Sequence, residues 1–86
     1  MKIIIKTHKI EISGPTVKVF YLEVNDSYTI EKIKQQIQSN TGISLDGQSL
    51  FFGGKQLEDK LRLSNYRIQK ESVVDVVYRG KNRLID

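Results

Sequence analysis

The segment GGKQLEDKLRLSNYRIQKES, residues 53–72, has the most distinctive composition in this chain of 86 residues. It carries charges of both signs, its apolar residues follow neither a helix nor a strand period, and it contains no cysteine or histidine. This pattern predicts an irregular segment over residues 56–70, with about one helical turn, that a few apolar side chains fix to a core. We expect the Tyr66 hydroxyl to hydrogen-bond the loop backbone. The expected anchors are Leu57, Leu63 and Ile68.

Strand patterns flank this segment on both sides. Residues 2–12 and 16–24 alternate apolar with polar side chains, and Ser13-Gly14-Pro15 between them is a turn signal, so the two segments predict a hairpin. Residues 50–52 form a short apolar run that ends at two glycines, and residues 73–79 are rich in β-branched side chains. We therefore expect four main strands, with the long loop before the last of them.

A single helix is predicted between the hairpin and the third strand. Thr29 is a suitable N-cap, and Ile30, Ile33 and Ile37 then recur at a helical spacing on one side. Gly42 provides the C-terminal stop. The resulting order, two strands, a helix, a strand, a loop and a strand, is typical of an α+β fold in which one helix packs against a mixed sheet.

The predicted core follows from these elements. If odd positions of the first strand face the helix, every inward-facing side chain is apolar, as a sheet covered on one side requires. Each such side chain stabilises the fold by roughly 1.5–3 kcal/mol when buried. The expected inward set is Ile3, Ile5, Phe20, Leu22, Val24, Ile30, Ile33, Ile37, Leu50, Leu57, Leu63, Ile68, Val74 and Val76.

Composition excludes several classes of function. The chain lacks cysteine, which excludes disulfides, thiolate nucleophiles and sulfur metal ligands, and no apolar run is long enough for a membrane span. Its 14 basic residues are interleaved with 10 acidic ones, giving a net charge of +4 without a block of like charge. This distribution favours a solvated surface over a nucleic-acid partner.

No set of residues predicts catalysis. His8 is the only histidine and has no cysteine partner, and Phe52-Gly53-Gly54-Lys55 lacks the spacing and the hydroxyl residue of a phosphate loop. Glu58 and Asp59 are adjacent in the loop and are better interpreted as turn residues than as an acid/base pair. We therefore expect a non-enzymatic protein without a metal or cofactor.

At several places the residues resemble ubiquitin. MKIIIKT at the N-terminus is similar to its first strand, and residues 29–43 are similar to its helix. Residues 54–59 and 63–72 match its long loop almost letter for letter. The resemblance spans about residues 1–79 and implies a β-grasp fold, with a mixed sheet of about four or five strands on one helix. Residues 80–86 would then be a C-terminal extension or the start of a linker.

The resemblance also implies a protein-binding surface on the outward side of the sheet. In ubiquitin this surface is a small apolar patch with basic and amide groups around it. Asp75 stands where ubiquitin has a histidine and would repel partners with an acidic rim. The alternative is that Phe51 is simply an exposed aromatic residue. The matching positions are Phe51, Gly54, Lys55, Asp75, Val77 and Arg79.

Conjugation is the family's other activity, and it needs a C-terminal Gly-Gly. Here Arg79 matches a family arginine, but Gly80 stands alone before Lys81. We therefore expect a non-conjugated module that docks on a ubiquitin receptor, a ubiquitin-pathway enzyme or the proteasome, in the cytoplasm or the nucleus; a processed covalent modifier is the alternative. Lysines that match those of ubiquitin and could be modified are Lys6, Lys34, Lys55 and Lys70.

The predicted hairpin is about seven residues longer than the family's. Even positions of its first strand and odd positions of its second share the outward side, which predicts an apolar stripe with charged residues at its rim. Such a stripe indicates an interface, including weak self-association, unless the extension folds over and covers itself. The stripe would include Ile4, His8, Ile10, Ile12, Val17, Val19 and Tyr21, with Lys2, Lys6, Lys18 and Glu23 at its rim.

Overall fold

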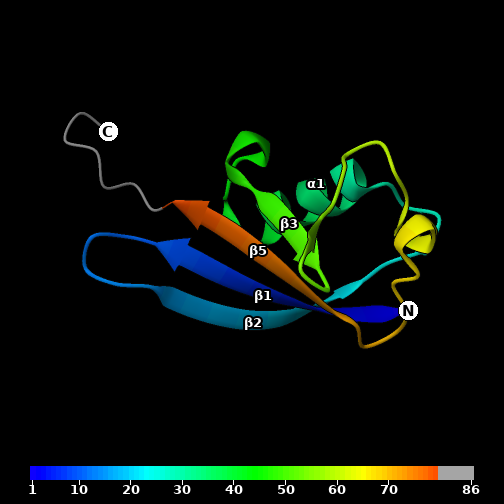
Figure 1. The fold of residues 1–86 in the computed structure, drawn as a ribbon, viewed down its shortest axis with the longest axis horizontal. Coiled ribbons are helices and arrows are strands. Elements are labelled where there is room, and N and C mark those ends of the chain that lie inside the picture. The colour runs from blue at the N-terminus through cyan, green and yellow to red at the C-terminus, as the bar shows by residue number, and fades with distance from the viewer. Residues whose placement is uncertain (80–86) are drawn as a thin grey trace.

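The computed structural model describes residues 1–79, in which one helix lies across one side of a five-stranded sheet (Figure 1). The strand order is β2-β1-β5-β3-β4, with β1 and β5 parallel and all other pairs antiparallel. This arrangement confirms the predicted α+β, β-grasp fold. The elements are β1 (Lys2–Ile10), β2 (Thr16–Glu23), α1 (Ile30–Thr41), η1 (Leu45–Gly47), β3 (Ser49–Phe52), β4 (Lys55–Gln56), η2 (Leu63–Tyr66) and β5 (Val73–Arg79).

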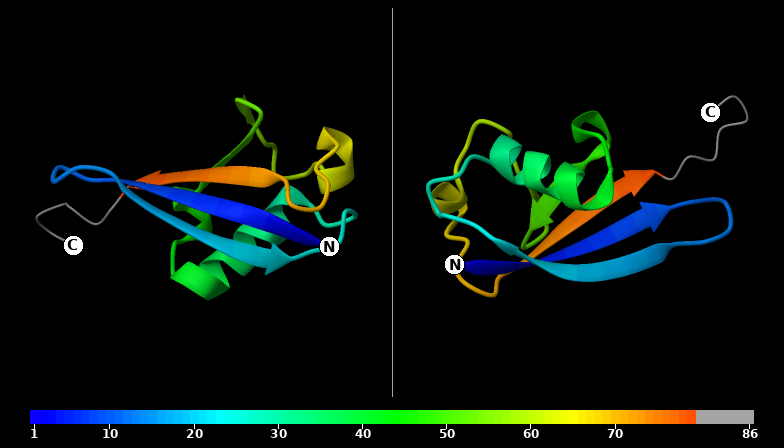
Figure 2. Two further views of the ribbon diagram at one scale, coloured as in Figure 1. Left: turned by 90° about the horizontal axis from the view of Figure 1, so that it is seen from below. Right: turned by 180° about the vertical axis from the view of Figure 1, so that it is seen from behind.

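The hairpin of β1 and β2 projects beyond the rest of the domain, and α1 does not extend under its tip (Figure 2). The prediction that the first strand continues to residue 12 is wrong, because β1 ends at Ile10. The Gly14 N–H donates to the Glu11 carbonyl at 3.1 Å, so the chain already turns there. Ile12 consequently lies in the turn, 89% exposed, and is not part of a strand stripe.

Helix α1 begins and ends at the two predicted residues. The Thr29 side chain accepts a hydrogen bond from the Lys32 N–H, as an N-cap does. Gly42 has φ of 80°, a left-handed conformation that glycine adopts without strain, and its N–H donates to the Gln38 carbonyl. The fully buried residues of the helix are Ile30, Ile33 and Ile37. Among the residues described, no helix is long and apolar enough to cross a membrane.

The irregular segment is fixed as its apolar residues predict. Leu57, Leu63 and Ile68 are buried, and the Tyr66 hydroxyl accepts a hydrogen bond of 2.8 Å from the Glu58 N–H. The prediction missed that this segment begins with β4, which pairs with β3 across the Gly53-Gly54 turn, because two residues are too few to show a strand period. It likewise did not anticipate the short helix η1.

The core contains every residue of the predicted inward set except Phe20, which is only half-buried. Phe20 lies beside an open hollow at the C-terminal end of α1, between Asn40, Thr41 and the hairpin, and within residues 1–79 this hollow leaves one side of its ring uncovered. Two buried polar residues were not predicted. Thr7 faces the core from β1, and the Gln48 amide donates to the carbonyl of Lys34 within α1 and to that of Ile43 just after it. The predicted extension over 80–86 lies outside the described residues.

A candidate protein-binding surface on the outer sheet face

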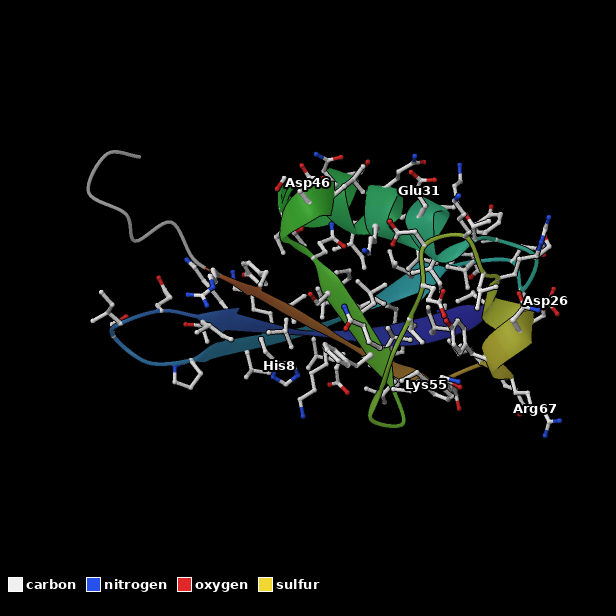
Figure 3. All side chains as sticks on the ribbon, turned by 45° about the horizontal axis from the view of Figure 1, so that its top comes forward. His8, Asp26, Glu31, Asp46, Lys55 and Arg67 are labelled. Carbon is white, nitrogen blue, oxygen red and sulfur yellow. The ribbon has the colours of Figure 1, made fainter. Side chains whose placement is uncertain are left out.

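We use "outer face" for the side of the sheet opposite α1. Strand pairing aligns its side chains in two neighbouring rows, because paired residues of adjacent strands point to the same side. One row runs Val19, Lys6, Asp75, Phe51 from β2 to β3, and the next runs Val17, His8, Val77, Ser49. In Figure 3, His8 lies on this side of the sheet, whereas Glu31 and Asp46 lie on the helix side.

Phe51 and Val77 lie on neighbouring strands of the outer face, on the same side of the sheet as Asp75. Phe51 pairs with Asp75, and Val77 pairs with Ser49. Phe51 and Val77 are therefore diagonal neighbours, a separation of roughly 7–8 Å that an aromatic side chain can span. Both are half-buried on the same side of the sheet, and we call these two residues the patch.

The Asp75 carboxylate has a partner that the sequence did not reveal. The His8 Nε2 atom lies 2.9 Å from the Asp75 Oδ1 atom, and Lys6 is the residue of β1 in direct register with Asp75. Asp75 therefore contacts the His8 imidazole, and both His8 and the in-register Lys6 are contributed by β1. The parallel pairing of the first and last strands creates this contact, and no local pattern around His8 predicts that pairing.

The hairpin end of the outer face is apolar mainly because of β2. Val17, Val19 and Tyr21 are 48%, 59% and 62% exposed, while Ile4 is half-buried beside Tyr21. The shared side that the strand parity predicts is confirmed. Lys6, however, lies within the rows and not at the rim, so Lys6 and His8 separate the β2 residues from Phe51 and Val77.

Charged groups border the face at both ends. The Lys2 ammonium lies 5.7 Å from the centre of the Tyr21 ring. The N-terminal ammonium donates to the exposed Glu23 carboxylate at 2.8 Å, and this hydrogen bond holds the pKa of Glu23 below its ordinary value. Arg79 is exposed at the end of β5, where it pairs with Ile10.

Gly54 and Lys55 lie at the border of the surface. Gly54, with φ of 79°, is the second residue of the turn between β3 and β4. Lys55 follows it on β4 and pairs with Phe52, which points away from the outer face. The Lys55 ammonium lies 5.6 Å from the centre of the Tyr66 ring, so the lysine extends toward the loop and not over Phe51 (Figure 3).

Comparison with known proteins assigns the chain to a family. The model of the ubiquitin family matches residues 5–81. The chain belongs to the ubiquitin family. It is 36% identical to ubiquitin domain-containing protein 1 of Danio rerio over 72 residues. These aligned residues make up 84% of this chain but only 32% of that relative. It is also 33% identical over 69 residues to NEDD8-like protein RUB3 of Arabidopsis thaliana, covering 80% of this chain and 88% of the relative.

A third relative is the ubiquitin-like protein NEDD8 of Dictyostelium discoideum, 32% identical over 68 residues. The chain thus spans about a third of the length of the first relative and most of the length of the other two. The relatives thus include both a ubiquitin domain-containing protein and NEDD8-like proteins, and family membership by itself does not say which of them this chain follows.

The four lysines that match those of ubiquitin differ in accessibility in this member of the family. Lys55 and Lys70 are exposed, and Lys6 is half-buried in the outer face. The Lys34 side chain is only 12% exposed, and its ammonium lies 2.7 Å from the Asp59 carboxylate, where it ties α1 to the loop. Modification at Lys34 would require this contact to open.

The titratable side chains of residues 1–79 include a contact that resembles part of a catalytic site. Within that range, no group of three or more His, Cys, Asp or Glu side chains is placed to hold a metal ion. The His8–Asp75 contact resembles the base and orienting acid of a catalytic pair. Within residues 1–79, however, no serine, threonine or lysine nucleophile hydrogen-bonds the His8 or Asp75 side chain.

Proposed function

We propose that this chain is a non-conjugated ubiquitin-like interaction module that docks through its outer sheet face on a ubiquitin receptor, a ubiquitin-pathway enzyme or the proteasome. One observation carries the proposal: Phe51 and Val77 form an apolar patch in the middle of the face, with Lys6, His8 and Asp75 beside it. An apolar centre with a charged surround is the usual anatomy of a protein interface.

The charges beside the patch define the partner that fits it. Asp75 alone would repel a partner segment with acidic residues at its rim, but the His8 imidazole contacts this carboxylate, and Lys6, in register with Asp75 on β1, adds a positive charge to the face. A segment with apolar anchors and a mixed or acidic rim therefore fits this face. Such receptors operate in the cytoplasm and the nucleus, and that location is part of the proposal.

Two sequence observations support a module over a modifier. Ubiquitin domain-containing protein 1 of Danio rerio carries a similar segment within a longer protein. In this chain, Gly80 is followed directly by Lys81, and no two glycines are adjacent within residues 80–86. The second candidate is a processed covalent modifier. Two relatives whose names include NEDD8 favour it, since the chain covers 88% of the length of each.

Incubation with ubiquitin-activating enzyme and ATP distinguishes the two candidates. We expect no thioester-linked adduct of the purified chain, because the activating enzyme requires a terminal Gly-Gly that these residues do not provide. Ubiquitin in the same reaction is the positive control. Formation of an adduct, seen as a reductant-sensitive band on a gel, would favour the modifier. Docking itself is tested by titrating ubiquitin receptors into the isotope-labelled chain.

A further inference from the structure

β2 is an outer edge of the sheet, and the hydrogen bonds around it show which of its backbone groups are free. The Met1 ammonium donates to the Val24 carbonyl, and the Val24 N–H donates to the Met1 carbonyl, each at 2.8 Å. In an antiparallel pair, hydrogen-bonded and non-bonded residue pairs alternate. Counting back from Val24, the even residues of β2 bond to β1, and the odd residues direct their N–H and C=O groups away from it.

The bonds on the other side of β1 agree with this assignment. The Ile4 N–H donates to the Ser72 carbonyl and the Lys2 carbonyl accepts from the Glu71 N–H, so even residues of β1 bond toward β5. Their β2 partners, which include Tyr21 opposite Ile4, are therefore the non-bonded ones. Within residues 1–79, the backbone groups that this edge leaves free belong to Val17, Val19 and Tyr21, and to the Glu23 N–H, since the Glu23 carbonyl accepts a hydrogen bond from the Gln36 side chain.

Val17, Val19 and Tyr21 are also the exposed large apolar residues of β2. Edge strands are normally protected by being short or by carrying charges and proline among the pairing residues. β2 has eight residues, Pro15 precedes it, and its internal lysine, Lys18, is among the residues already bonded to β1. The free edge is thus both long and apolar on the outer face.

We propose that a second copy of this chain pairs with β2, antiparallel, about a two-fold axis at Val19. Val19 then lies opposite Val19 of the second copy, and Val17 lies opposite Tyr21 at both ends. Each of these pairs exchanges two backbone hydrogen bonds, because all three residues direct their N–H and C=O groups to the free edge. The same pairing joins apolar side chains on the outer face, which stabilises antiparallel strands.

Neighbouring registers fit less well. An axis at Lys18 places two lysines directly opposite each other, which is destabilising. An axis at Phe20 places Val17 opposite Glu23 of the second copy. The Glu23 carbonyl, however, already accepts a hydrogen bond from the Gln36 side chain at 3.3 Å. An axis at Val19 avoids both, placing Lys18 opposite the second copy's Phe20. The register therefore follows from hydrogen bonds that the monomer already makes.

The proposed dimer does not depend on the docking proposal. β2 and β3 are separated by β1 and β5 in the sheet, so pairing at the β2 edge leaves Phe51 and Val77 uncovered. A single strand pair buries little area, and the two Lys18 side chains lie diagonally across the junction. We therefore expect a concentration-dependent dimer that strengthens as added salt screens the lysines.

Hydrogen exchange at low and high protein concentration tests the pairing directly. In dilute solution the amides of Val17, Val19 and Tyr21 should exchange fast, while those of Lys18, Phe20 and Leu22 should be protected by β1. At high concentration, where sedimentation shows a mass above the monomer's 9.9 kDa, the three odd-numbered amides should become protected. A mass that stays at the monomer value, or a dimer in which these amides still exchange fast, would overturn the proposal.

A matched pair of variants separates edge pairing from stacking of two outer faces. Val19→Lys places like charges opposite each other at the two-fold axis and should weaken association about tenfold or more. Val73→Lys introduces the same side chain on the same face, at a residue that is 42% exposed on the interior strand β5, and should leave association unchanged. Equal weakening by both variants would show that the faces stack, and would contradict the register.

Discussion

Ile37→Ala is expected to lower the free energy of unfolding by about 2–5 kcal/mol. Ile37 is fully buried on the side of α1 that packs against the sheet, so its truncation leaves a cavity in the centre of the core. Leu57→Ala should act similarly, because Leu57 anchors the irregular segment to the same core. The loss is a large fraction of the total stability of a domain this small, which is of the order of 5–10 kcal/mol.

Chemical denaturation measures this effect, and the chain offers a control of the same residue type. Ile12→Ala removes the same atoms from a turn residue that is 89% exposed, and it should change the free energy by no more than about 0.5 kcal/mol. A denaturation midpoint for Ile37→Ala equal to that of the natural sequence would show that the core is assigned wrongly.

Phe51→Ala is expected to weaken binding of a ubiquitin receptor by at least about 1–2 kcal/mol, roughly 5- to 30-fold in affinity. Phe51 is the aromatic member of the patch with Val77, and buried aromatic side chains contribute most to such interfaces. Calorimetric titration gives the affinity, and an unchanged amide spectrum away from β3 shows that the fold is intact.

Tyr21→Ala is the matched control for this prediction. Tyr21 is a larger exposed aromatic residue on the same outer face, 62% exposed, but it lies at the β2 edge, away from the patch. Its removal should leave receptor affinity nearly unchanged. An equal loss of affinity for both variants would place the docking surface on the hairpin, and an unaffected Phe51→Ala would remove the patch from the interface.

Local patterns were sufficient to predict most of the fold. Helix α1 follows from its cap residues and from three isoleucines at a helical spacing, and β5 begins and ends where its β-branched run does. The core set follows from strand alternation. The pattern failed for Phe20, since alternation gives the direction of a side chain but not whether the helix is long enough to cover it.

Features that depend on pairing between distant segments could not be predicted in this way. The His8–Asp75 contact requires the parallel pairing of β1 with β5, 67 residues apart in the chain. The diagonal placement of Phe51 and Val77 depends on the register of β3, which a short strand does not specify. The end of β1 at Ile10 is set by the turn at Glu11, although the alternation of the sequence continues further.

The most direct test of the proposed function is an amide chemical-shift map of the labelled chain during titration with a panel of ubiquitin receptors. We predict that receptors change the amide chemical shifts of residues 51–55 and 75–79, together with that of His8, which contacts Asp75. Perturbations at 16–23 that depend only on protein concentration belong to the β2 edge and are expected separately. If none of the receptors shifts 51–55 or 75–79, this ubiquitin-family chain is not a ubiquitin-mimicking docking module.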